Sequence, residues 1–243
     1  MKTSHTLSFY VSLHDTGPGG IIKIPSIFNC FQTLAAAHTN TIGFGGVDVL
    51  AKGYTWVISR YRLSILRLPS LFEKFTATTW RFGEINHYAI REFLVKDHKD
   101  NIIIKGTSSW ILLNTAKREP VTPSRLFPDY PLIQERALEE NFASIPKISR
   151  PDKEKEFSVR LNDLDMNRHV NNSIYASWIL ETGEDMNEGK KPVDISLNFR
   201  GETHYGQTVI SQAERNEKEN IIIHKLMCKD TGKELTRGTT SWE

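Results

Sequence analysis

Residues 106–110 read Gly-Thr-Ser-Ser-Trp, and residues 238–242 repeat them 132 positions later as Gly-Thr-Thr-Ser-Trp. A Lys-Asp pair with the character of a turn precedes each copy, at residues 96–97 and 229–230. Four identities in five residues could be a coincidence, but the segments around the two copies also follow the same order. The chain therefore reads as a duplicated unit of about 120 residues.

Each half contains one segment with the spacing of an amphipathic helix. Apolar residues recur at this spacing between Pro25 and Gly43, and again between Val170 and Gly183. Strand-like segments surround the two helices, at residues 6–13, 55–68, 72–82, 86–95 and 102–113, and at 157–162, 193–202, 207–215, 220–228 and 235–242. One helix and about five antiparallel strands, present twice, indicate the α+β class. A sheet wrapped around one long helix is the hot-dog arrangement, so we expect two tandem hot-dog domains, with a generic α+β duplication as the alternative.

Prolines mark the connection between the halves. Six of the ten prolines lie between residues 120 and 151, where their fixed φ and missing N–H exclude a central strand. This window predicts a connection with at most one short helix, around Leu132 to Phe142. The expected boundaries are an N-terminal domain at 1–130, a linker at 131–152 and a C-terminal domain at 153–243.

Composition excludes several classes of protein. A formal net charge of +2 is too small to indicate nucleic-acid binding, although it suits an acidic partner better than a basic one. We expect no membrane span, because no stretch approaches the roughly 20 apolar residues that one needs. Two cysteines, far apart at Cys30 and Cys228, give neither a metal-ligand spacing nor a disulfide framework. A soluble cytoplasmic protein without metal or cofactor is the simplest interpretation.

The densest polar cluster lies where the second half passes from strand to helix, at residues 162–172. Asp165, Asn167 and His169 alternate, so an extended chain would turn them to one side. We expect His169 and Val170 to open the helix, whose first N–H groups carry partial positive charge. A carboxylate, an amide, an imidazole and oxyanion donors together suit acyl transfer. The alternative is a structural turn with a helix cap, since Asn and Asp favour such places.

The same residues resemble a known family. Residues 165–175 read Asp-Met-Asn-Arg-His-Val-Asn-Asn-Ser-Ile-Tyr, which resembles the D-x-N-x-H-V-N-N-x-x-Y signature of acyl-ACP thioesterases. Part of that signature also occurs in other hot-dog thioesterases, so the resemblance of residues 54–60 and 72–80 to the family's first domain matters. The resemblance covers essentially the whole chain. It implies hydrolysis of fatty acyl-ACP, which releases the free fatty acid and ends chain elongation in fatty acid biosynthesis.

The resemblance also assigns roles after the helix. In the family a strand ends in an R-x-E-C-like run, and residues 200–203 here read Arg-Gly-Glu-Thr. Glu202 thereby falls on the family's catalytic carboxylate, and Thr203 stands where the plant enzymes have cysteine. Because both cysteines lie outside these motifs, the departure favours water over a thiolate as the attacking group.

Two mechanisms remain open on this basis. In the first, Glu202 or Asp165 acts as the base, His169 orients or shuttles the proton, and Asn167 with a helix N–H stabilises the oxyanion. In the second, Asp165 attacks the thioester directly and forms a mixed anhydride. The resemblance implies that the second half supplies the chemistry and that the first half binds the acyl chain. One site per chain is expected, because the first half keeps only Asp15 in the corresponding approach to its helix.

The implied partner is the acidic acyl carrier protein (ACP) with its phosphopantetheine-linked acyl chain, and a homodimer is a further option. Alternatives are an acyl-CoA thioesterase and a non-catalytic hot-dog module that binds acyl thioesters. The lack of a transit peptide favours a bacterial setting over a plastid one. Basic residues in the inter-domain stretch are candidate carrier contacts: Lys147, Arg150, Lys153 and Lys155.

Overall fold

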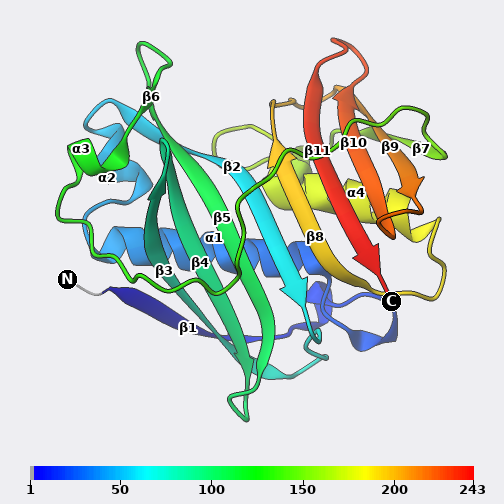
Figure 1. Cartoon of the computed structure of the whole chain (residues 1–243), viewed down its shortest axis with the longest axis horizontal. Coiled ribbons are helices and arrows are strands. Elements are labelled where there is room, and N and C mark those ends of the chain that lie inside the picture. Colours follow the sequence, from blue (N-terminus) through cyan, green and yellow to red (C-terminus); the bar gives the residue numbers. More distant parts are fainter. Residues whose placement is uncertain (1–2) are drawn as a thin grey trace. The chain divides into compact units, whose positions relative to one another are not determined.

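The computed structural model describes residues 3–243 (Figure 1). The chain forms two compact units that divide between Asn141 and Phe142. Each unit pairs one antiparallel sheet with one long helix, which confirms the expected α+β class. Over the described residues, no helix is long and apolar enough to cross a membrane.

Unit 1, residues 3–141, is built around helix α1 (Ile24–Thr41), which has Pro25 in its first turn as predicted. The apolar stripe of α1 packs against the sheet, so that Phe28, Phe31 and Leu34 are fully buried. The strand order is β1-β3-β4-β5-β2, and β6 pairs with the end of β5. The strands are β1 (Ser4–Tyr10), β2 (Tyr54–Ile65), β3 (Lys74–Ile85), β4 (Tyr88–Asp97), β5 (Ile102–Asn114) and β6 (Pro120–Val121). The short helices are η1 (Leu13–Asp15), η2 (Pro18–Gly20), α2 (Gly46–Leu50) and α3 (Pro123–Leu126).

Unit 2, residues 142–243, repeats this plan around helix α4 (Asn172–Glu184). Its strand order is β8-β11-β10-β9-β7, and α4 packs against β9, β10, β7 and β11. The strands are β7 (Lys153–Ser158), β8 (Pro192–Phe199), β9 (Thr208–Asn216), β10 (Ile221–Cys228) and β11 (Glu234–Trp242). The short helix η3 (Leu161–Asp163) follows β7 as η1 follows β1.

The repeated pentapeptide occupies the same place in both units. A Cβ at Gly106 would lie 2.6 Å from the ring of Phe31 in α1, and one at Gly238 would lie 2.9 Å from Leu197 and 3.4 Å from Ile179 in α4. Glycine is needed at both positions because the helix and the sheet approach each other closely there.

The tryptophan that ends each pentapeptide makes the same contact in both units. Trp110 Nε1 donates to Ser108 Oγ at 2.8 Å, and Trp242 Nε1 donates to Thr240 Oγ1 at 2.7 Å. The duplication inferred from the sequence therefore extends to individual hydrogen bonds.

Residues 132–142 do not form the short helix that the sequence predicted, and the helix in the proline window is α3. The segment is instead held across the sheet of unit 1 by hydrogen bonds with Trp80 and Glu92. It lies on the face opposite α1. Gly106 faces the helix, and because side chains alternate between faces, the next residue, Thr107, faces the segment. A row of residues in register crosses this outer face from strand to strand: Trp80, Glu92, Thr107 and Arg62.

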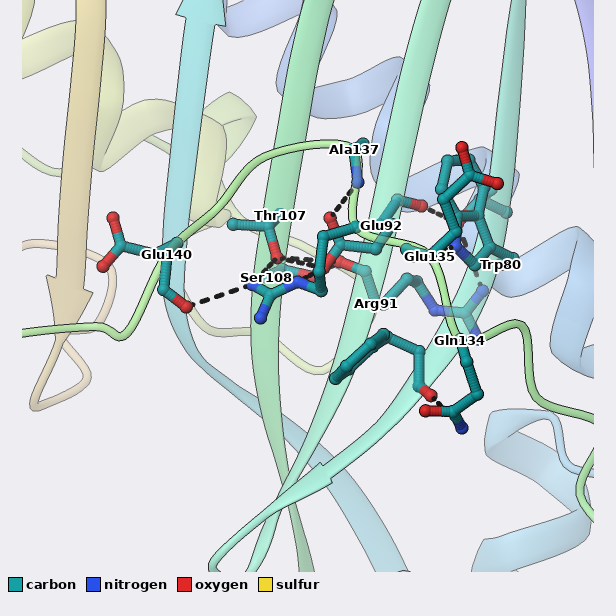
Figure 2. Close-up of polar contacts among 12 residues, drawn as sticks. Trp80, Arg91, Glu92, Thr107, Ser108, Gln134, Glu135, Ala137 and Glu140 are labelled. Atoms are coloured by element: carbon teal, nitrogen blue, oxygen red, sulfur yellow. Dashed lines mark hydrogen bonds and ion pairs between the residues drawn. The ribbon is translucent and has the colours of Figure 1, made fainter.

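Glu92 anchors the segment (Figure 2). One carboxylate oxygen accepts from Arg136 Nε and from Thr107 Oγ1, both at 2.7 Å, and the other accepts from Ala137 N at 3.0 Å. Glu92 is fully buried, and burial raises the pKa of its carboxyl against the opposing effect of these donors. Trp80 Nε1 donates to the Glu135 carbonyl at 2.8 Å. The backbone groups that a helix would pair internally are thus bound to the sheet.

Candidate active site

Helix α4 begins later than the sequence predicted. Helix α4 begins at Asn172, with Asn171 as its N-cap, whose side-chain oxygen accepts from Ser173 N at 3.0 Å. His169 and Val170 therefore lie before the helix and do not open it. The physical reason is that the Asn171 side chain satisfies a free N–H of the first turn, while Val170 pairs with Leu164 in an isolated β-bridge.

Asp165 closes residues 165–169 into a tight loop. Its Oδ1 accepts from the backbone N–H of Asn167 at 2.8 Å and of His169 at 3.1 Å. Its own N–H donates to the His169 carbonyl at 2.7 Å. Arg168 takes a positive φ of 64° to complete the turn. One oxygen of the carboxylate is therefore committed to the loop backbone.

The structure brings His169 and Glu202 together. His169 Nε2 lies 3.7 Å from Glu202 Oε2, and the two side chains are 38% and 57% exposed, so both can reach solvent and a substrate. Val170 N donates to the Thr203 carbonyl at 3.4 Å, which joins the loop to the segment that follows β8. An imidazole and a carboxylate at this separation can pass a proton between them through a small rearrangement or a water molecule.

Asn167 contacts Asp165 through its backbone N–H. Its side chain is exposed, and over residues 3–243 its carboxamide makes no hydrogen bond with Asp165, His169 or Glu202. The alternation in sequence thus brings these residues together through a turn, as the structural alternative suggested, and not through an extended strand.

Thr203 is buried and engaged. Its N–H donates to Tyr175 Oη at 3.2 Å, and its hydroxyl donates to Gln207 Oε1 at 2.8 Å. Burial raises the pKa of Tyr175, which stays a neutral phenol. These contacts link α4 to the segment that carries Glu202. The sequence signature included Tyr175 without giving it a role, and it gave no signal for Gln207.

Neither cysteine is placed to act as a nucleophile. Burial, together with the charge of Asp15, raises the pKa of the Cys30 thiol to about 12. Cys228 is buried at the end of β10. Reactive cysteines have a lowered pKa and are accessible, so the structure is consistent with the expectation against a Cys–His pair.

The loop that precedes α1 in unit 1 closes with the same backbone hydrogen bonds, although Gly19 takes a positive φ of 75° and its counterpart Asn167 does not take a positive φ. Gly17 N donates to the Ile21 carbonyl at 2.9 Å, as Asp165 N donates to the His169 carbonyl at 2.7 Å. Gly20, with φ of 71°, takes the place of Arg168. The two loops can therefore be compared residue by residue.

This comparison corrects the expectation for Asp15. The Asp15 carbonyl accepts from Lys23 N at 2.8 Å, and the Asp163 carbonyl accepts from Asn171 N at 2.8 Å. Asp15 is therefore the counterpart of Asp163, and not of Asp165. The sequence could not show this offset, because the two loops share closing hydrogen bonds without sharing residues.

The four unit 1 counterparts of the candidate site residues have no side chain that binds a proton or donates a hydrogen bond. They are Gly17, Gly19, Ile21 and Leu68, in place of Asp165, Asn167, His169 and Glu202. Leu68 is placed by a shared contact, since the next residue, Pro69, accepts from Ile22 N at 3.0 Å as Thr203 accepts from Val170 N.

Known proteins resemble the chain over nearly its whole length. Oleoyl-acyl carrier protein thioesterase 2, chloroplastic, from Arabidopsis thaliana is 26% identical in an alignment of 293 positions that covers 98% of this chain and 76% of the relative. An acyl-ACP thioesterase structure from Bacteroides thetaiotaomicron has a TM-score of 0.89 at 22% identity and covers 99% of this chain and 98% of its own. The 12:0-ACP thioesterase structure from Umbellularia californica has a TM-score of 0.88 at 24% identity, with 100% and 98% coverage. These structures confirm the expected fold of two tandem hot-dog domains.

Two family models match the sequence. The acyl-ACP thioesterase N-terminal domain matches residues 2–128, and the acyl-ACP thioesterase C-terminal domain matches residues 147–243. Since these matches leave only the connecting segment and the first residue uncovered, the chain belongs to the acyl-ACP thioesterase family.

Proposed function

We propose that the chain hydrolyses the thioester of fatty acyl-ACP at the loop before α4, and that Asp165, Asn167, His169 and Glu202 are the residues responsible. The observation that carries this assignment is the 3.7 Å approach of His169 Nε2 to Glu202 Oε2 beside a loop closed by Asp165. The names of the relatives support the substrate class, since they include oleoyl-acyl carrier protein thioesterases and acyl-[acyl-carrier-protein] hydrolases.

In the proposed mechanism, water attacks the thioester carbonyl while Glu202, directly or through His169, takes the water proton. The tetrahedral intermediate carries an oxyanion, for which the proposed donors are the Asn167 carboxamide and an N–H group at the start of α4. Collapse breaks the C–S bond, and the same proton passes to the leaving sulfur. The products are a free fatty acid and the carrier thiol.

The geometry favours this mechanism over direct attack by Asp165. Two backbone N–H groups already donate to Asp165 Oδ1, so this oxygen is engaged and not free to attack. Attack would also have to dismantle the bonds that hold the loop closed. Glu202 is more exposed to solvent than Asp165, and it lies beside His169, with which it can exchange a proton. We therefore assign the role of base to Glu202.

We assign binding of the acyl chain to unit 1, because unit 1 keeps the fold and lacks all four reactive side chains. The proposed domain limits are 1–130 and 153–243 with a linker between them. We place the enzyme in the cytoplasm, although the relatives in plants are named chloroplastic, and we include a homodimer as part of the proposal.

The decisive experiment measures release of free thiol from acyl-ACP and from acyl-CoA with the same acyl group. Hydrolysis of acyl-ACP by the wild type, with loss in the Glu202→Gln variant, is the expected result. Hydrolysis of acyl-CoA alone would reassign the substrate, and binding without hydrolysis would make the protein a non-catalytic module.

A further inference from the structure

The large apolar side chains that unit 2 exposes gather at the candidate active site. Over the described residues from 142 onward, Leu161, Met166 and Tyr205 are 69%, 94% and 65% exposed, and no other large apolar side chain of that unit is exposed. Each lies within four residues of Asp165 or Glu202 along the chain. We call Leu161, Met166 and Tyr205 the site-loop patch.

Hydrogen bonds hold together the segments that carry this patch. Val159 N donates to the Gln207 carbonyl at 2.9 Å, and Gly206 N donates to the Val159 carbonyl at 3.3 Å. The Val170 to Thr203 bond connects the same segments on the other side of η3. Exposed apolar side chains on such neighbouring segments can form the contiguous apolar surface that marks an interaction site.

Two arginines flank the patch. Arg160 precedes Leu161, and Arg168 lies in the same loop as Met166. Both are exposed, and over residues 3–243 neither guanidinium forms an ion pair. The nearby Asp163 carboxylate is occupied by the backbone N–H of Arg160 at 2.7 Å. The patch therefore presents apolar surface with two guanidinium groups at its edge that are not engaged in ion pairs within the described chain.

The basic residues that the sequence suggested for this role are less suitable. Lys153 pairs with Asp185 at 3.1 Å, and Lys155 pairs with Asp185 at 3.1 Å and with Glu181 at 3.5 Å. These acidic neighbours cancel the charge that would attract an acidic partner. Lys147 and Arg150 remain exposed, but they lie outside the loops of the site.

We propose that the site-loop patch, with Arg160 and Arg168, is the surface that docks the acidic carrier protein. This inference rests on the proposed function, because the carrier must come close enough for its acyl thioester to reach His169 and Glu202. Charge complementarity selects the carrier over other occupants: an acidic protein surface gains from two free guanidinium groups, and its apolar side chains cover Leu161, Met166 and Tyr205.

Unit 1 supplies a matched control. Leu13 opens η1 as Leu161 opens η3, and it is 72% exposed against 69% for Leu161. The two leucines have the same local structure and nearly the same exposure, but Leu13 adjoins the loop that lacks the reactive side chains. A charge introduced at Leu13 therefore imitates the surface change without touching the proposed docking surface.

The test compares acyl-ACP with the N-acetylcysteamine thioester of the same acyl group, which has no carrier protein. In Leu161→Glu and Arg160→Glu, we expect kcat/KM for acyl-ACP to fall by about tenfold more than kcat/KM for the small thioester, mainly through KM. Leu13→Glu should leave the ratio of the two within about twofold of the wild type. Circular dichroism and melting curves establish that each variant is folded.

An unchanged ratio in Leu161→Glu and Arg160→Glu would overturn the docking surface, and so would an equal change in Leu13→Glu. A larger effect in Lys147→Glu and Arg150→Glu would move the surface to the inter-domain stretch. A wild-type enzyme that hydrolyses neither thioester would instead contradict the proposed function itself.

Discussion

Glu202 and Thr203 are neighbours with opposite environments, and the difference decides their roles. The Glu202 side chain is exposed beside His169, whereas Thr203 is fully buried with its hydroxyl bound to Gln207. A group that takes a proton from water needs access to solvent. A buried hydroxyl with a fixed acceptor serves better to hold the backbone in place.

We therefore expect Glu202→Gln to lower kcat by a factor on the order of 10² or more, the range typical of general-base removal. Thr203→Ala should keep most of the activity and lose about 1 kcal/mol of stability, because it removes one buried hydrogen bond. Steady-state kinetics and urea unfolding of both variants check this. An inactive but folded Thr203→Ala enzyme would point to a threonine nucleophile.

His224 makes stability depend on pH. It is fully buried in β10, and burial lowers its pKa to about 3 from an ordinary value of 6.5. The unfolded chain binds a proton below pH 6.5 while the folded chain resists it down to about pH 3, so stability falls as the pH drops through this window. At pH 5 the loss is about 2 kcal/mol relative to pH 7.

Urea unfolding of the wild type and of His224→Gln at pH 7 and pH 5 measures this contribution. Glutamine keeps a polar group near Thr240, whose hydroxyl lies 2.8 Å from His224 Nε2, and it cannot be charged. The variant should therefore lose less stability than the wild type between the two pH values. An identical loss in both would assign the acid sensitivity to other groups.

At the scale of elements, the sequence predicted α1 and most of the repeated strands well, but it placed the first strand of the second half at 157–162, whereas β7 spans Lys153–Ser158 and η3 follows it. The signals of the elements predicted well are local: apolar spacing, glycine at close approaches and a specific motif. The prediction failed at residues 132–142, because the groups that hold them extended, Glu92 and Trp80, lie about 40 to 60 residues away in the sequence. The Tyr175–Thr203 contact was missed for the same reason.

The attachment of residues 132–142 to the sheet of unit 1 should depend on Glu92. Glu92→Ala leaves the Arg136 guanidinium, which is only 10% exposed, without its carboxylate, and we expect about 3 kcal/mol of lost stability. The matched control is Glu156→Ala, whose ion pair with Lys229 is about half exposed and should contribute less than about 1 kcal/mol. Urea unfolding gives both values, and limited proteolysis should cut residues 131–141 faster in Glu92→Ala alone.

Substitutions in the loop before α4 should reduce turnover far more than substitutions in the loop before α1. Asp15→Asn should leave turnover within a few-fold of the wild type, while Asp165→Asn and His169→Ala should nearly abolish it. Asparagine at 165 can still accept the two backbone N–H bonds, so its effect reports the charge more than the loop. Melting curves must show all three variants folded, and equal loss at Asp15 and Asp165 would contradict the proposal of one site per chain.

For the whole molecule, the duplication allows the two proposed tasks, acyl-chain binding and catalysis, to lie in different units. A single copy would have to perform both. Both units keep the helix, the sheet and the close contact at the repeated glycine. Only unit 2 has the four candidate site side chains. The first half lacks the Asn-x-His motif, so the sequence already indicated that the two halves are unequal. Matching the two loops residue by residue, however, required the hydrogen bonds seen in the structure.

We expect the enzyme to prefer acyl-ACP over acyl-CoA with the same acyl group. Added salt should lower kcat/KM for acyl-ACP more than for acyl-CoA, because attraction between exposed charges on two proteins is screened. The measurement is a salt series with both substrates. Equal or CoA-favouring kcat/KM would show that the carrier protein is not recognised.

The loop of unit 1 has the closing hydrogen bonds of the unit 2 loop but none of its four candidate site side chains, and this makes it a vacant scaffold. Its backbone already closes between Gly17 and Ile21 as the loop of unit 2 closes between Asp165 and His169. Gly17→Asp, Gly19→Asn, Ile21→His and Leu68→Glu would together place the four side chains on a loop with the same closing hydrogen bonds, and the asparagine would have to adopt the positive φ of 75° that Gly19 takes. The duplicated fold thus offers the chain a recipient loop for a second, engineered centre.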